Sequence, residues 1–194
     1  SWAPDSTQVA FLSDATDLTP DPPASGGSRG VVYVKSLRSA EVTRVATTTL
    51  WSEAVAWSPD GHAIYLRGSA HQDPTMDCTT PLDPEDTYTD PCSHTALLRH
   101  TFATGDSAAT TRAIACARLF MAGSGPSGCS AHDLRPSPDG GFVLFRSTYD
   151  CYHCGQVFEL IPAQGGTPRE ICYYGTGGEG YMYPASCSVS LWHG

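Results

Sequence analysis

A short motif, Trp-Ser-Pro-Asp-Gly at residues 57–61, most constrains how this chain can fold. Alternating apolar runs flank it, with Val55 and Trp57 before the turn and Ile64 and Leu66 after it. Runs with a period of two are typical of strands, and they are often buried on one side only. Proline presets φ for a turn, aspartate accepts hydrogen bonds from the backbone just after it, and glycine tolerates positive φ. The stretch therefore predicts a strand, a tight turn and a second strand.

The same pattern occurs at two other places in the chain. A Pro-Asp pair at residues 4–5 precedes an apolar run at 8–12, and Pro-Asp-Gly at 138–140 precedes another at 142–145. Each copy is followed by more strand-like segments, as in stacked β units that cannot bury their apolar faces alone. The sequence thus predicts an all-β fold of three four-stranded antiparallel sheets, with no helix of useful length.

This repeat resembles the WD40-like (PD40-type) repeat of TolB-like β-propellers. The same unit builds the propeller of prolyl-oligopeptidase-type peptidases. The resemblance covers essentially the whole chain, and it implies that each sheet is a propeller blade. Its functional implication is binding or scaffolding, although a propeller fold by itself does not fix a function.

Each blade is expected to have strands A to D, with the Pro-Asp turn joining A to B. The expected strands are 7–12, 31–36 and 41–48 (B to D) in blade 1, 53–57, 62–67, 95–102 and 108–115 in blade 2, and 131–135, 141–147, 156–161 and 168–173 in blade 3. One propeller-type domain would then comprise blade 1 at 1–52, blade 2 at 53–116 with a Cys-bracketed insertion at 68–94, blade 3 at 117–185, and a complementing strand at 186–194.

Strand A of blade 1 is almost missing in this division, whereas the last alternating segment has no turn after it. That segment consists of Ser186, Cys187, Ser188, Val189, Ser190, Leu191 and Trp192. We expect it to supply strand A of blade 1 in another copy of the chain, which would self-assemble into a closed ring or a filament. The alternative is that the chain is a propeller fragment of a larger secreted protein. Trp2, Trp57 and Trp192 share one position of strand A and are expected to pack between blades.

Net charge and cysteine content limit the class of protein. The chain has 20 acidic against 11 basic residues, a formal net charge of −9, which argues against nucleic acid or an anionic membrane surface as a partner. No apolar run approaches membrane-spanning length, so we expect no membrane insertion. The eight cysteines fall mostly in Gly/Pro/Ser/Thr-rich loops, which favours disulfides and an extracellular or periplasmic location.

Pairing of cysteines that are neighbours along the chain would close each long loop. The expected bonds join Cys78 with Cys92, Cys116 with Cys129, Cys151 with Cys154, and Cys172 with Cys187. Eight cysteines allow about 105 pairings, so spacing alone does not prove this one. For Cys151-Tyr152-His153-Cys154 a redox dithiol or half of a zinc site is the alternative. We expect structural disulfides and no bound metal.

Loop lengths point to one end of the sheets as the partner face. The A–B and C–D turns are short, whereas the B–C and D–A connections are long and leave from the same end of an up-and-down sheet. Long loops on a rigid scaffold commonly carry function. The candidate contact residues for a protein ligand are Trp51, Asp77, Asp83, Glu85, Asp86, Asp90, Tyr152 and His153. The acidic loop could offer oxygen ligands to Ca²⁺ but lacks the EF-hand spacing, so a solvated, partner-binding loop is favoured.

No arrangement of catalytic residues stands out. The sequence has no Gly-x-Ser-x-Gly elbow, and its Gly-x-Gly-x-x-Gly match at 175–180 is not followed by a helical pattern. Seven histidines are scattered without an arranged nucleophile. We therefore expect a scaffold without catalytic residues or cofactors. The rival interpretations are the non-catalytic part of a propeller peptidase and a metal- or redox-active secreted protein.

Overall fold

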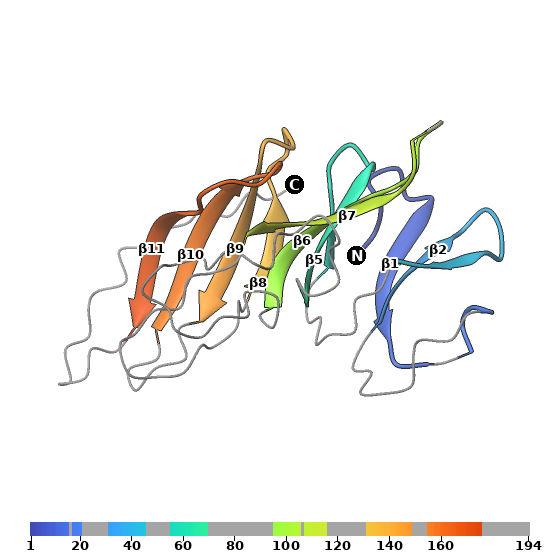
Figure 1. The fold of residues 1–194 in the computed structure, drawn as a ribbon, viewed down its shortest axis with the longest axis horizontal. Coiled ribbons are helices and arrows are strands. Elements are labelled where there is room, and N and C mark those ends of the chain that lie inside the picture. The colour runs from blue at the N-terminus through green and yellow to red at the C-terminus, as the bar shows by residue number, and fades with distance from the viewer. Residues whose placement is uncertain are drawn as a thin grey trace, which may run out of the picture.

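A computed structural model describes residues 1–15, 17–20, 31–45, 55–69, 95–105, 107–115, 131–148 and 155–175 of the chain. Within these ranges there are strands and turns but no helices, so the expected all-β fold is confirmed for them (Figure 1). In the same ranges, no helix is long and apolar enough to cross a membrane.

In the described residues, eleven strands form three antiparallel sheets, which we call blades 1 to 3. Blade 1 contains β1 (Gln8–Ser13), β2 (Val31–Ser36) and β3 (Val42–Arg44); blade 2 contains β4 (Val55–Trp57), β5 (Ala63–Ser69), β6 (Thr95–Thr101) and β7 (Thr110–Ala115); blade 3 contains β8 (Ala131–Pro136), β9 (Phe142–Thr148), β10 (Gly155–Pro162) and β11 (Arg169–Gly175). Within each blade, strands that are neighbours in sequence pair with each other, as in an up-and-down sheet. The strand bounds agree closely with the sequence predictions, except that β3 ends at Arg44, well short of residue 48.

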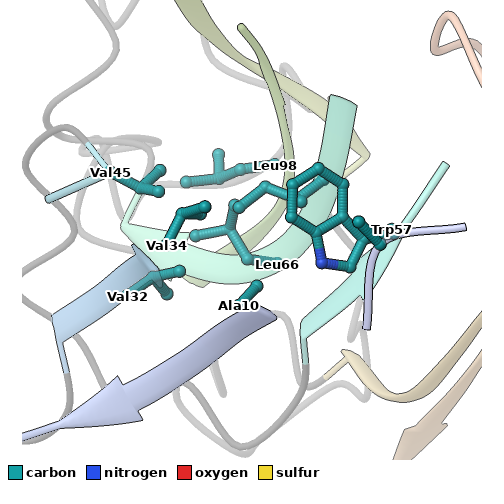
Figure 2. Close-up of a cluster of buried hydrophobic side chains, with 9 residues drawn as sticks. Ala10, Val32, Val34, Val45, Trp57, Leu66 and Leu98 are labelled. Carbon is teal, nitrogen blue, oxygen red and sulfur yellow. The ribbon is translucent and has the colours of Figure 1, made fainter. Parts of the chain in front are cut away.

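The three blades follow one another along the long axis of the molecule (Figure 1). Alternating side chains pack between neighbouring blades. Ile64 and Leu66 on β5 face blade 1, whereas Tyr65 between them faces blade 3. The first interblade core consists of Ala3, Ala10, Val32, Val34, Val45, Trp57, Ile64, Leu66 and Leu98 (Figure 2). The second consists of Ala56, Tyr65, Leu97, Ile114, Leu134, Val143, Phe145, Ile161 and Ala163. Burying each large aliphatic side chain contributes about 1.5–3 kcal/mol, so these two cores hold the stack together.

The first residues of the chain lie where strand A of blade 1 would end. Trp2 forms an antiparallel bridge with Val9 on β1. The Ala10 N–H donates to the Ser1 carbonyl at 2.9 Å, and the Ser1 ammonium donates to the Ala10 carbonyl at 2.9 Å. The structure agrees with the expectation that strand A of blade 1 is almost missing, because only residues 1–3 occupy the last part of this position. The predicted complementing strand, residues 186–194, lies outside the described residues, and strand exchange stays a prediction.

Registers define equivalent positions in the three blades. Trp2 pairs with Val9, and Trp57 pairs with Ile64. Pro136 pairs with Val143 in the same way. Trp2, Trp57 and Pro136 are therefore one position of the repeat, and the positions of the following turn and strand are found by counting from it.

Candidate interaction surface

The turn between the first two strands is a closed hydrogen-bonded unit in blade 2. The Ser58 N–H donates to the Ala63 carbonyl at 2.8 Å, and the Gly61 N–H donates to the Ser58 carbonyl at 2.9 Å. The Ala63 N–H donates to the Ser58 hydroxyl oxygen at 2.9 Å. Blade 3 repeats this geometry, with the Phe142 N–H donating to the Ser137 hydroxyl oxygen at 2.9 Å.

The turn aspartates are bound within their own turns. The Asp60 carboxylate accepts the Ser58 hydroxyl at 2.5 Å and the His62 N–H at 2.9 Å. The Ser58 bond is the main reason why the pKa of Asp60 lies below its usual value, followed among the favourable contacts by the His62 N–H. This carboxylate therefore closes the turn, and its accepting atom is already used.

Blades 1 and 3 hold their turn aspartates in related ways. The Ser137 hydroxyl and then the Gly141 N–H lower the pKa of Asp139. In blade 1 Ala3 stands in the serine position, so Asp5 accepts the Thr7 N–H at 3.0 Å and the Thr7 hydroxyl at 2.8 Å. These bonds lower the pKa of Asp5, the backbone bond most strongly. The three aspartates thus share a role in building turns.

Successive turns contact one another across the blades. A Cβ placed on Gly61 would lie 3.8 Å from Cδ of Pro4, and one on Gly140 would lie 3.8 Å from Cδ of Pro59. Gly61 and Gly140 have φ of 72° and 71°, and Ser6 at the same position of blade 1 has φ of 57°. The proline of each turn therefore lies against the positive-φ residue of the next turn, and the short turns form one row.

A polar clamp joins strands β6 and β7 of blade 2 to the turn between β10 and β11 of blade 3. Arg112 Nη2 donates to the Gln164 carbonyl at 2.9 Å and to Gln164 Oε1 at 2.7 Å. Arg99 Nη1 donates to the same Oε1 at 2.8 Å. Burial raises the pKa of the neighbouring Tyr65 hydroxyl, so this phenol stays neutral beside the guanidinium of Arg99. Sequence reasoning missed the clamp, because residues 52 and 65 positions apart leave no local pattern.

Trp57 packs between blades 1 and 2, as the sequence predicts. Its Nε1–H donates to the Ser1 carbonyl at 3.2 Å, and its ring stacks on Phe102 with centroids 5.1 Å apart. Figure 2 shows the indole beside Ala10 and Leu66. The same expectation is wrong for Trp2 within this chain, because Trp2 is 63 % exposed. Trp192 lies outside the described residues.

His100 is buried on β6 and belongs to the packed interior. Its Nδ1 lies 2.7 Å from the Thr111 hydroxyl, and its ring meets Phe102 edge-on at 5.1 Å. Loss of solvation lowers the pKa of His100 to about 4. The imidazole is therefore neutral near pH 7.

The long connections leave from one end of each blade. Because neighbouring strands are antiparallel, the ends of β1, β5 and β9 lie beside the starts of β2, β6 and β10. Figure 1 shows β1, β9 and β11 pointing towards the same side of the molecule. The strand order thus agrees with the expected separation of short turns from long loops. The candidate contact residues themselves lie outside the described residues: Trp51, Asp77, Asp83, Glu85, Asp86, Asp90, Tyr152 and His153.

Cys172 is the one cysteine in the part of the chain that the structure describes. It lies on β11, is buried, and is disulfide-bonded. The other predicted disulfide cysteines, Cys78, Cys92, Cys116, Cys129, Cys151, Cys154 and Cys187, lie outside that part, so the predicted pairing is untested. Among the described side chains, no group of three or more His, Cys, Asp or Glu is placed to hold a metal ion.

Comparison with known proteins shows similarity of fold only. No protein-family model and no curated protein matches the chain. Among solved structures it is similar to a protein assigned as TolB from Agrobacterium tumefaciens, with 17 % identity, a TM-score of 0.56, and coverage of 90 % of this chain and 48 % of that one. TolB from Acinetobacter baumannii is also similar, with 14 % identity, a TM-score of 0.48, and coverage of 87 % and 30 %.

The chain therefore spans about half the length of the Agrobacterium protein. The likeness to that structure covers nearly all of this chain, and it agrees with the three antiparallel sheets described above. The fold of this chain is that of a TolB-like β-propeller.

Proposed function

We propose that this chain is a non-catalytic β-propeller module that binds a protein partner with its long-loop end. The observation that carries this proposal is the asymmetry between the two ends of the blades. At one end the turns are short, and their backbone and carboxylate groups bond to each other. At the other end most connections are longer: residues 14–30, 45–54, 70–94 and 116–130 join successive strands there, and only the connection 149–154 is as short as a turn of the first end. Long loops on a rigid scaffold are the usual place for recognition.

The charge of the long loops suggests the chemistry of the partner. Five of the eight candidate contact residues are acidic: Asp77, Asp83, Glu85, Asp86 and Asp90. The whole chain also carries a formal net charge of −9. A partner with a basic surface fits both facts, and its association should slow as salt screens the attraction.

We place the protein outside the cytosol, in the extracellular space or the periplasm. Eight cysteines in 194 residues and the disulfide at Cys172 support this location, because disulfides persist in oxidising compartments. The same bonds would stabilise a small loop-rich domain against unfolding.

Self-assembly by strand exchange is part of the proposal. Residues 1–3 bond along residues 8–10 of β1, and the same edge of β1 continues through residues 11–13. An alternating segment such as residues 186–192 could pair there, since strand edges accept added strands. A ring would result if the rotation between copies closes, and a filament otherwise.

A second candidate function follows from length. Because the chain covers 48 % of the TolB structure it resembles, it could be the propeller part of a larger secreted protein. That protein would be a TolB-like binding module or a prolyl-oligopeptidase-type peptidase whose propeller gates or selects substrate. A longer reading frame that carries further blades or a Gly-x-Ser-x-Gly elbow would favour this candidate.

Partner binding is tested with two charge-matched variants in the native host. The first, Asp83→Asn with Asp86→Asn, changes the long-loop end. The control, Glu41→Gln with Glu170→Gln, removes the same charge from exposed positions on the blades. Cross-linking and mass spectrometry should recover a partner with the wild type and the control but several-fold less with the loop variant. Equal recovery from all three proteins, or equal loss from both variants, would contradict the proposed face.

A further inference from the structure

Four large hydrophobic side chains are strongly exposed among the described residues. They are Trp2 at 63 %, Leu37 at 48 %, Phe142 at 42 % and Ile171 at 42 %. The first two belong to blade 1 and the last two to blade 3. Blade 2, which has a neighbour on both faces, contributes none of them.

The two exposed residues of blade 1 occupy positions that are buried or half-buried in the other blades. Trp2 is equivalent to Trp57, which is 6 % exposed. Leu37 is equivalent to Ala163, since both donate their N–H across the sheet just after the third strand, to the Thr7 carbonyl at 2.8 Å and the Gly141 carbonyl at 2.9 Å. Ala163 is 3 % exposed.

The two exposed residues of blade 3 are also equivalent to buried ones. Phe142 and Ala63 occupy the same position after the Pro-Asp turn, since their carbonyls accept the N–H of Ser137 and of Ser58. Ala63 is fully buried. Ile171 lies in a break of register between β10 and β11, and Ile114 lies in the same break between β6 and β7. Ile114 is 5 % exposed, because it packs against blade 3, where a Cβ on Gly165 would lie 3.4 Å from its Cα.

The four residues fall into two groups according to the side of the sheet on which each position lies. Trp57 and Ala163 belong to cores shared with the preceding blade. Ile114 belongs to the core shared with the following blade, and Ala63 lies on the same face of β5 as Tyr65, which also belongs to it. We call Trp2 and Leu37 the leading face of the chain, and Phe142 and Ile171 its trailing face.

We propose that the leading face of one copy packs on the trailing face of a second copy, head to tail, in the way that successive blades pack within the chain. This head-to-tail contact rests on the self-assembly in the proposed function. The two copies meet here through sheet faces, whereas in that proposal they meet through an exchanged strand. A second copy is the occupant that fits, because each face is the missing half of the other. Two copies would also bring together six sheets, and one copy covers 48 % of the TolB structure.

The internal junctions predict the register of this contact. Pro138 would lie against Ser6, as Pro4 lies against Gly61 and Pro59 against Gly140. Ser6 already has the positive φ of 57° that this place requires. The Trp2 indole would donate to the Arg135 carbonyl of the other copy. This bond would be equivalent to the one from Trp57 to the Ser1 carbonyl.

Among the described residues of each face, only the side chains near the short turns are exposed to solvent. Tyr33 in the middle of blade 1 is fully buried, and its hydroxyl donates to the Ala15 carbonyl at 3.3 Å. Leu144 in the middle of blade 3 is 3 % exposed. The contact is therefore expected to centre on the turn end, and the long-loop end stays available to a partner.

Sedimentation of three single variants tests the contact. Leu37→Asp changes the leading face, Ile171→Asp changes the trailing face, and Ala103→Asp is the control at an exposed site of the central blade. All three sites are exposed in the single chain, so the fold should be kept, and circular dichroism during thermal unfolding checks this. Each face variant should raise the dissociation constant of self-association about 100-fold or more, because its carboxylate would lose water at the junction without a partner. The control should match the wild type.

Mixing the two face variants gives the decisive result. In a head-to-tail contact, the intact trailing face of Leu37→Asp meets the intact leading face of Ile171→Asp, so the mixture should associate although neither variant does alone. A wild-type chain that stays monomeric at high concentration would overturn the proposal and leave partner binding standing. Association that survives both face changes but disappears when residues 186–194 are deleted would overturn it in favour of strand exchange alone.

Discussion

The indole nitrogen of Trp57 donates to the backbone carbonyl of Ser1 at 3.2 Å, so a side chain of blade 2 bonds the residue that begins blade 1. The same carbonyl accepts the Ala10 N–H at 2.9 Å. One oxygen thus joins the N-terminal residues both to β1 and to the next blade. This bond explains how a segment of three residues is held in the place of a full strand.

Trp57→Phe should keep the aromatic packing and lose only the interblade hydrogen bond. The Ser1 carbonyl retains its bond from Ala10, so the free energy of unfolding should fall by about 1 kcal/mol. Trp57→Ala should cost about 3–5 kcal/mol, because it also leaves a cavity. Urea unfolding measures both values. Trp2→Phe is the matched control: at concentrations where the chain is monomeric, a loss as large as that of Trp57→Phe would contradict the role of the Trp57 bond.

Ser6→Gly should stabilise the chain by about 1 kcal/mol. Ser6 has φ of 57°, where a side chain is disfavoured, and the equivalent positions of the other turns carry glycine. The reverse change, Gly140→Ala, should destabilise by a similar amount, since φ there is 71°. Thermal unfolding of the two variants should therefore shift in opposite directions, and a shift in the same direction would show that the backbone conformation of Ser6 costs nothing.

Gln164→Ala should loosen the junction of blades 2 and 3 by about 1 kcal/mol, because both arginines lose a side-chain acceptor. Gln164→Glu should keep the clamp, since a carboxylate accepts the same bonds with added charge attraction. The exposure of the clamp limits that gain. Chemical unfolding that ranks the glutamate variant at or above the wild type, and the alanine variant below it, would agree with this geometry.

Much of the fold could be predicted from the sequence, because its signals are local. A Pro-Asp turn between two alternating apolar runs predicts both the strands and their order. Ten of the strands lie close to the expected positions. The fourth strand of blade 1 was predicted too long: β3 ends at Arg44, and Val45, although buried, lies outside the strand. Burial of an apolar residue does not require ladder pairing, so the apolar pattern continued past the strand.

The surfaces between blades were harder to predict. The pattern places Trp2 and Trp57 at one position of the repeat but does not say which copy has a neighbour, so the exposure of Trp2 was missed. The clamp at Gln164 depends on residues from two blades, and no spacing along the chain indicates it. Sequence reasoning also named contact residues in the long loops, and those remain predictions.

Stability should fall as pH decreases from about 6.5 towards 4. The pKa of His100 is lowered to about 4, so the unfolded chain binds a proton at higher pH than the folded chain, and unfolding is favoured across that window. The loss should reach about 3 kcal/mol, and His100→Gln should remove it. Below about 4 the turn aspartates add a further loss, because their folded pKa values are lowered and their stabilisation disappears on protonation. Urea unfolding at a series of pH values checks the sign, and equal slopes for wild type and variant would contradict it.

Sedimentation equilibrium of the intact chain, combined with electron microscopy of the same sample, tests the central claim that three blades are completed by another copy. The account predicts masses that are multiples of 20.6 kDa, with closed rings or regular filaments in the images. A single species of 20.6 kDa at every concentration, with the same unfolding curve after deletion of residues 186–194, would contradict it.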